Sequence, residues 1–331
     1  MIELSDRFVC AADEVWRLQR GSEADCVFFQ RMVNGGKRIT DRGSRQGTWL
    51  CAPGGVVLAR VNSRDTEKVL ATMERALAAW EELPEEQRHV PADADLESRK
   101  RWEDSFPEQG LVLERIAREL TTEGLARTPH ARWNRDFAWF SGSEVRAWIP
   151  EDAEVGDVIR LPLVARRLAR FHLVDNVRGQ TLPFADEEVQ EAILNALVTA
   201  REGSLLSLSL QGRTLAAAAG AWLLGENLWK PSRDIPHGIQ CGLMGEARFD
   251  LAQGTFQTFE LVAIGRRWGH TQMNGRGRDD APGLIGFHLE LAPSAPRIAP
   301  TFVVAYGVDW IVPPGLPTWV DSPAECGLEE D

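Results

Sequence analysis

The stretch RFHLVDNVRGQTLPF, residues 170–184, places three chemically active side chains close together. His172 and Asp175 are the residue types from which a general base is built, and Arg178 suits an anion. The apolar start of the stretch predicts a β-strand, in which successive side chains alternate between two faces. His172 and Asp175 then point to opposite faces, and the DN-x-RG sequence predicts a turn. The pattern therefore favours a strand and a salt-bridged turn over a catalytic pair.

A second candidate region is GRRWGHTQMNGRGRDD, residues 265–280, which is rich in arginine and glycine. One hypothesis is a loop whose arginines bind an anionic group. The alternative is a solvated hairpin loop whose arginines pair with Asp279, Asp280 and other acids. The arginines of this loop are Arg266, Arg267, Arg276 and Arg278. The candidate ligand-binding residues of the two regions together are His172, Asp175, Arg178, Trp268, His270, Arg276 and Arg278.

Soft metal ligands form a third candidate set that could suit copper. Strand positions four residues apart lie roughly 13 Å apart at about 3.3 Å per residue, too far to share one ion. A copper site would therefore require a bent or helical backbone. The five cysteines include no CxxC pair, so neither a disulfide framework nor a structural zinc site is expected. The possible copper ligands are His237, Cys241, Met244, His270 and Met273.

Familiar catalytic signatures are missing from the chain. The sequence contains no GxSxG, HExxH or GxxxxGK[ST] motif, and no GxGxxG that follows a strand. We therefore expect a non-enzymatic protein that binds a small anionic ligand or a protein partner, without a cofactor. The alternative is an enzyme that uses His172 or His270 as its general base.

Composition and charge limit the classes of partner. A length of 331 residues predicts about two domains. The net charge of −12 disfavours nucleic acid and anionic membrane surfaces. The chain shows neither a signal peptide nor an apolar run long enough to span a bilayer. We expect no membrane insertion and a cytoplasmic location for the sequence as given, or export if an N-terminal signal has been removed.

Residues 1–83 show an α/β pattern. An apolar run at 7–12 suggests a strand, 22–33 a helix, 47–61 a hairpin centred on APGG, and 63–84 an amphipathic helix. This order resembles the later portion of a thioredoxin-like domain. The segment lacks the CxxC motif and the proline that usually precedes the hairpin, so the resemblance implies the fold without thiol–disulfide exchange.

The remaining chain predicts a linker and a larger β-rich domain. Residues 84–108 are rich in charge and proline and suggest the linker. Residues 109–331 contain many short apolar segments separated by glycine turns, with a short helical insertion near 141–150 that begins with the capping box Ser141-x-x-Glu144. Residues 110–121 suit a helix or a strand. We predict an α+β protein with a larger antiparallel sheet or partly closed barrel.

A second resemblance covers most of the chain. The landmarks WNRDFAW, RFHLVDNVRGQ, GEARFDLAQGTFQTFELVAIGRRWG and PGLIGFHLELA occur in this order. They resemble an uncharacterised bacterial, planctomycete-type family with a degenerate thioredoxin-like N-terminal segment and a β-rich C-terminal domain. The similarity spans roughly residues 1–295. It assigns no catalytic residue, and it implies export for many relatives.

Overall fold

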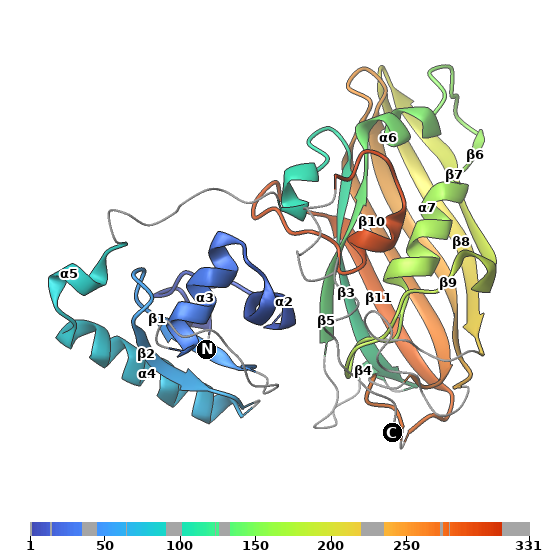
Figure 1. Cartoon of the computed structure of the whole chain (residues 1–331). Helices are drawn as coiled ribbons and strands as arrows, with labels where there is room; N and C mark the ends of the chain where they lie inside the picture. Colours follow the sequence, from blue (N-terminus) through green and yellow to red (C-terminus); the bar gives the residue numbers. More distant parts are fainter. Residues whose placement is uncertain are drawn as a thin grey trace. The chain divides into compact units, whose positions relative to one another are not determined.

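A computed structural model describes two compact units of the chain, which are drawn in Figure 1. Unit 1 lies within residues 1–100 and unit 2 within residues 101–313. Among the described residues, no helix is both long enough and apolar enough to cross a membrane. The described residues are 2–13, 15–34, 45–63, 65–90, 101–122, 124–125, 133–219, 235–271, 274–277 and 279–312.

Unit 1 combines short helices with a two-stranded antiparallel sheet. The predicted hairpin and both predicted helices are confirmed, but the strand predicted at 7–12 is wrong. Within this stretch only Phe8 packs, together with Leu4, against the core formed by Leu50 and Met73, and Val9 is fully exposed. The elements are α1 (Ile2–Ser5), α2 (Val15–Arg20), α3 (Ala24–Asn34), β1 (Thr48–Cys51), β2 (Val57–Val61), α4 (Thr66–Glu82) and α5 (Glu85–Arg88).

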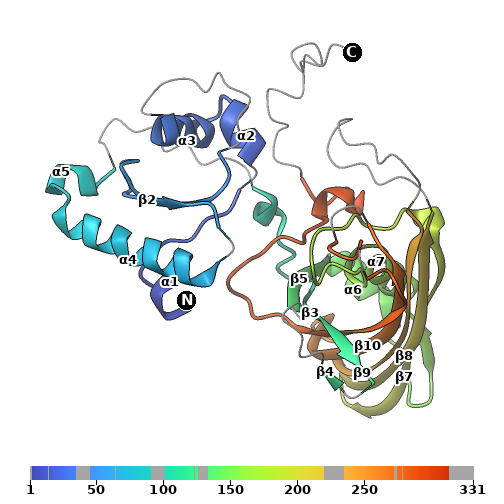
Figure 2. The same cartoon turned by 90° about the horizontal axis from the view of Figure 1, so that it is seen from below.

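Unit 2 is built on one nine-stranded antiparallel sheet. Its order is β4-β3-β11-β10-β9-β8-β7-β6, and β5 also pairs with β3. The sheet curves without closing, so the α+β prediction with a large antiparallel sheet is confirmed (Figure 2). The strands are β3 (Leu111–Thr121), β4 (Gly124–Leu125), β5 (Trp133–Phe140), β6 (Val158–Arg160), β7 (Val189–Glu202), β8 (Leu205–Ala218), β9 (His237–Asp250), β10 (Thr255–Gly269) and β11 (Gly283–Leu291).

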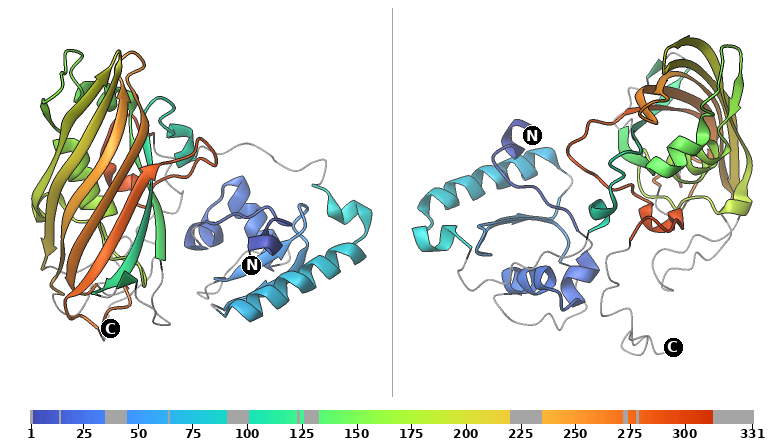
Figure 3. Two further views of the ribbon diagram at one scale, coloured as in Figure 1. Left: turned by 180° about the vertical axis from the view of Figure 1, so that it is seen from behind. Right: turned by 90° about the horizontal axis from the view of Figure 1, so that it is seen from above.

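Helices cover the concave face of this sheet, as the views of Figure 3 show. Ser141 caps α6: its side chain accepts a hydrogen bond from the Glu144 N–H, and the Glu144 carboxylate accepts one from the Ser141 N–H, so the predicted capping box is confirmed. The helices of unit 2 are η1 (Trp102–Ser105), α6 (Gly142–Trp148), α7 (Pro162–Arg167), η2 (Leu168–His172), η3 (Asp186–Glu188) and η4 (Val303–Tyr306).

The strand predicted at the start of residues 170–184 is wrong. Pro162 starts α7, and the π-helical turn η2 continues it through His172. Buried side chains at 161, 164, 165, 168 and 172 recur at helical spacing, so one helical face is covered by the sheet. A short apolar run fits a strand or a buried helix equally well, which explains the error. The apolar segment at 301–312 contains the short helix η4 (Val303–Tyr306).

The two ends of the sheet differ in their connections. At one end, which we call the tight-turn end, Gly203 with φ +64° and Gly254 with φ +68° close short turns between long strands. At the other end, which we call the long-loop end, β10 leads to β11 through residues 270–282. Binding residues are common on loops that a rigid sheet supports, so we expect a binding site at the long-loop end.

Candidate functional site

An ion-pair cluster fills the concave side of the sheet at the long-loop end. Arg276 is fully buried, and its Nε and Nη2 donate to the two carboxylate oxygens of Asp175 at 2.9 Å each. Its Nη1 donates to Glu119 on β3. Arg178 donates to Glu119 at 3.0 Å and to Asp279 at 2.8 Å. The cluster consists of Glu119, Asp175, Arg178, Arg267, Arg276 and Asp279.

Charge in the cluster is balanced, because three carboxylates face three guanidinium groups. Burial alone would raise the pKa of Glu119, but hydrogen bonds from Arg178 and Arg276 outweigh burial and hold this pKa below its usual value. Burial would likewise lower the pKa of Arg276, and its bonds to Asp175 and Glu119 raise it instead. The arginines are thus committed to internal partners and do not offer a free positive charge.

A second polar network surrounds His172. Its Nδ1 lies 3.0 Å from Asp136 Oδ2, and its Nε2 lies 2.6 Å from the Tyr306 hydroxyl. The other Asp136 oxygen accepts hydrogen bonds from the backbone and side chain of Thr301, each at 2.9 Å. The Trp139 N–H donates to the Tyr306 oxygen at 3.4 Å. These bonds fasten the segment that contains η4 to the edge strand β5.

Burial decides the protonation of the His172 network. It lowers the pKa of His172, with Asp136 opposing the shift, so the ring is neutral. The neutral ring donates from Nδ1 to Asp136 and accepts at Nε2 from the Tyr306 hydroxyl, whose pKa burial raises. Burial would raise the pKa of Asp136, but His172 and Arg115 hold it far below its usual value. Both ring nitrogens of His172 are occupied, and the side chain is fully enclosed, so it has no access to a substrate.

Arg115 on β3 lies between these two groups of polar residues. Its Nη2 is 3.5 Å from Asp136 Oδ2, and its Nη1 donates to Asn134 Oδ1 at 2.8 Å. The same Nη1 lies 3.5 Å from Asn176 Oδ1, next to Asp175 in the chain. Burial lowers the pKa of Arg115 to about 10, and Asp136 counteracts part of that shift. The interior near the long-loop end is therefore polar across several strands.

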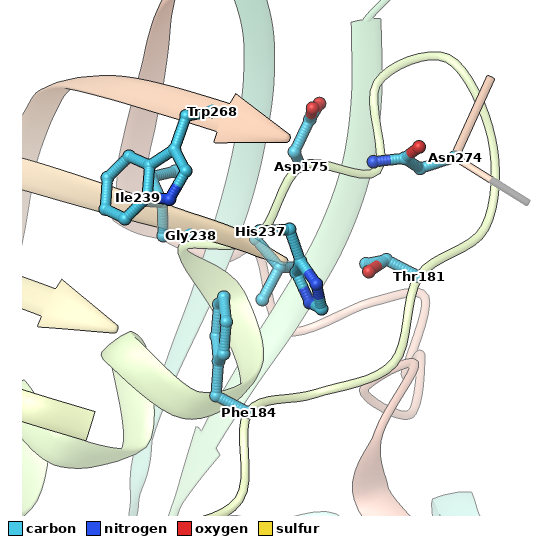
Figure 4. A pocket seen from close by; sticks show the side chains of 9 residues that line it. Asp175, Thr181, Phe184, His237, Gly238, Ile239, Trp268 and Asn274 are labelled. Carbon is cyan, nitrogen blue, oxygen red and sulfur yellow. The ribbon is translucent and has the colours of Figure 1, made fainter. Parts of the chain in front are cut away.

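A small pocket opens beside the ion-pair cluster (Figure 4). Its volume is about 10 Å³, which is room for about one water molecule. The Phe184 ring stacks on the His237 ring with 5.6 Å between centroids. A Cβ atom at Gly238 would lie 2.2 Å from the Trp268 ring, so this position requires glycine. The lining residues are Val174, Asp175, Thr181, Phe184, His237, Gly238, Ile239, Trp268 and Asn274.

Hydrogen-bonding groups remain available in this pocket. The Asn274 side-chain oxygen accepts from the N–H groups of Thr271 and Arg276, at 3.1 and 3.2 Å, which leaves its amide nitrogen as a donor. His237 Nδ1 lies 2.9 Å from the Ile235 carbonyl oxygen, so this nitrogen carries the proton and Nε2 is an acceptor. The Trp268 indole N–H has no hydrogen-bond partner among the described residues. Two donors and one acceptor therefore face a site the size of one small group.

The structure brings only part of the predicted site together. Asp175 and Trp268 line the pocket, whereas Arg178 and Arg276 lie behind it in the ion-pair cluster. His172 belongs to the separate network described above and does not contact Asp175 through a hydrogen bond. Three further predicted positions lie elsewhere: His270 is near Asp280 and outside the pocket lining, Arg266 is exposed on β10, and Arg278 lies outside the described residues.

The possible copper ligands are not assembled in the described part of the chain. Cys241 and Met244 lie on opposite faces of β9, because Cys241 is buried and Met244 is 65 % exposed. Burial raises the pKa of the Cys241 thiol to about 12, which disfavours the thiolate that binds metal. Met273 lies outside the described residues, and within them no group of three His, Cys, Asp or Glu side chains could hold a metal ion.

Several site residues were not predicted from the sequence. Arg115 and Glu119 lie in GLVLERIARELT and share one face of β3 with Leu111 and Leu113. Charges at inward positions of a strand are the signal that could have identified them. Asn274 had no comparable signal, because its role depends on a loop that folds against distant residues.

Known proteins add no further information about this site. No family model, no curated protein and no solved structure matches the chain.

Proposed function

We propose that unit 2 is a non-enzymatic binding module whose site is the pocket at the long-loop end. The ligand would insert one hydrogen-bond-accepting group, such as a carboxylate or carbonyl oxygen. The observation that carries this proposal is the pair of uncommitted donors, Trp268 Nε1 and Asn274 Nδ2, at one enclosed site. Protein sites commonly combine such convergent polar groups with aromatic walls, here formed by Phe184 and His237.

The size of the pocket limits what enters it. A volume of about 10 Å³ accepts a single oxygen-bearing group and not a whole metabolite. Because the adjacent ion-pair cluster is neutral, the attraction comes from the two N–H donors and not from a net positive charge. A small carboxylate and a neutral amide therefore both satisfy the site, and a cation does not.

Binding is better supported than catalysis for two reasons. His172 is enclosed with both nitrogens bonded, so it cannot take a proton from a bound substrate. His270 lies 3.8 Å from Asp280 and does not line the pocket. A third histidine, His237, lines the pocket, but among the described residues no hydrogen bond joins its ring to the Thr181 hydroxyl or to the Asp175 carboxylate, which bonds to Arg276 instead.

The test is a titration of the full chain with acetate, acetamide and methylammonium, followed by the indole N–H signals in two-dimensional NMR. We expect acetate and acetamide to shift the Trp268 signal and methylammonium to leave it unchanged. Trp268→Phe assigns the signal, and Asn274→Asp replaces a donor by an acceptor and should abolish the acetate effect. Trp133→Phe, at an exposed position outside the pocket lining, is the matched control. An unchanged Trp268 signal with all three probes contradicts the proposal.

We also propose that unit 1 is a thioredoxin-like segment without redox activity. The antiparallel pair β1–β2 and the helix α4 that packs against it support the resemblance. The sequence has no CxxC motif, and Cys10, Cys26 and Cys51 are free thiols. The purified chain should not accelerate the reduction of insulin disulfides by dithiothreitol, and acceleration at catalytic concentration would contradict this assignment.

A further inference from the structure

The strand β6 forms one edge of the sheet in unit 2 (Figure 1). The Leu161 N–H donates to the Leu194 carbonyl, and the Val198 N–H donates to the Asp157 carbonyl. Hydrogen-bonded positions alternate in an antiparallel pair, so the backbone at 157, 159 and 161 faces β7. The N–H and C=O groups of Val158 and Arg160 therefore face outward, where no described strand pairs with them.

A surface groove runs beside this free edge. Its volume is about 380 Å³, which is much larger than the pocket at the long-loop end. Val158 is 62 % exposed, and its cross-strand neighbour Leu197 is 41 % exposed. Val155, just before the strand, is 60 % exposed. A strand from a partner protein can pair with the free backbone groups of a sheet edge and cover the exposed apolar side chains beside them. The groove is lined by Pro150, Asp152, Ala153, Asp157, Val158, Ile159 and Arg160.

Charge around the groove selects between possible occupants. Four exposed carboxylates and two exposed guanidinium groups lie at the groove or next to it, which gives a local charge of −2. Among the described residues, no salt bridge involves Glu151, Asp152 or Arg160. A second copy of the chain would bring two acidic segments together, which disfavours self-association at this edge. A basic partner is attracted to it. The charged residues are Glu151, Asp152, Glu154, Asp157, Arg160 and Arg201, whose Nη1 donates to the Ala153 carbonyl at 2.7 Å.

We propose that the β6 edge binds an extended segment of a partner protein in which basic and apolar side chains alternate. The partner backbone would add a strand to the sheet through the outward groups of Val158 and Arg160. Its apolar side chains would cover Val158 and Leu197, and its basic side chains would meet Asp152 and neighbouring acids. Because β6 is only three residues long, a short peptide is enough to occupy the edge.

The first experiment uses peptides and the unmodified full chain. The probes are Ac-VKVKVKV-NH2 and the acidic analogue Ac-VEVEVEV-NH2, titrated at low and high salt with NMR detection. We expect the basic peptide to bind at least about tenfold more tightly and to weaken several-fold at high salt. Hydrogen exchange at the Val158 and Arg160 amides should slow on binding. The Ile159 amide, already paired with β7, should show little change.

A backbone-methylated basic peptide separates strand addition from simple charge attraction. Methylation on alternate amides keeps the charge but removes the ladder donors, so we expect about a tenfold loss of affinity. On the protein side, Val158→Pro removes an outward donor and leaves the bonds to β7 in place. Glu151→Gln with Asp152→Asn should weaken the basic peptide several-fold. Glu246→Gln with Glu260→Gln, on exposed positions of β9 and β10, is the matched control.

Three results would overturn the proposal. The first is equal affinity for the basic and acidic peptides, and the second is unchanged affinity after backbone methylation. The third is dimerisation of the chain without peptide that protects the Val158 and Arg160 amides, since a second copy would then be the occupant.

Discussion

The two halves of β3 place side chains of different chemistry in the interior of unit 2. On β3, the side chains of Leu111 and Leu113 face an apolar core near the tight-turn end. Two and six residues after Leu113, on the same face, Arg115 and Glu119 lie among charged partners at the long-loop end. Apolar contacts are non-directional, whereas ion pairs and hydrogen bonds fix the relative position of the groups that they join.

That difference explains how the pocket is held. Arg276 binds Asp175, which lines the pocket, and the Arg276 backbone N–H donates to Asn274, which also lines it. Arg178 and Glu119 join the same loops to β3. The arginines predicted to bind a ligand therefore position the loops that form the pocket. These directional contacts fix the arrangement of the loops at the long-loop end.

The largest expected effect comes from Arg276→Met. The substitution leaves the buried carboxylates of Asp175 and Glu119 without their shared partner. Removing one member of a buried ion pair costs about 3–5 kcal/mol, so the free energy of unfolding in urea should fall by that amount. The Trp268 and Asn274 signals should also move, because the loops lose their anchor. A loss below about 1 kcal/mol would show that the cluster is not needed for the fold.

Leu113→Ala tests the apolar half of the same strand. Leu113 is fully buried, so the change removes contacts and leaves a cavity. Such substitutions cost about 2–5 kcal/mol, and the loss should be the same at low and high salt because no charge is involved. Urea unfolding at two salt concentrations measures both quantities. If the Leu113→Ala loss changed with salt, or if the pocket signals moved as in Arg276→Met, the two halves would not be functionally distinct.

Sequence patterns predicted the parts of this protein that depend on local rules. The capping box at Ser141 and the hairpin β1–β2 around APGG follow from spacing and turn chemistry. The helical turn that carries His172 was mistaken for a strand, because both fit a short buried apolar run. The partner of His172, Asp136, is 36 residues away. Such pairings depend on sheet order, which one sequence does not reveal.

The pH dependence of stability reports on the His172 network. Burial lowers the folded-state pKa of His172 below the unfolded value of about 6.5. Below that pH the unfolded chain binds a proton that the folded chain does not, so stability falls as the pH decreases. Above that pH this group has no effect. The slope contributed by one such group is at most about 1.4 kcal/mol per pH unit.

Asp136 acts in a separate, more acidic window. Its folded-state pKa is lowered, so its stabilisation is present above the unfolded value of about 4 and is lost as the pH falls further.

Urea unfolding between pH 7.5 and 5 tests the contribution of His172. The free energy of unfolding of the original chain should fall as the pH decreases, and His172→Gln should reduce the slope of this dependence. Equal slopes in the two proteins would mean that His172 titrates alike in the folded and unfolded states.

The smallest effect is expected for Arg213→Met, which removes an ion pair of similar geometry in a different environment. Arg213 Nε lies 2.6 Å from Glu191 Oε1, but the two side chains are 61 % and 29 % exposed. Water and salt screen this pair, so its loss should cost about 0–1 kcal/mol and less at high salt. Comparing it with Arg276→Met in the same urea assay holds the type of substitution constant and varies burial. A loss equal to that of Arg276→Met would mean that burial does not set the difference, and the distinction between the charged interior and the ordinary surface would fail.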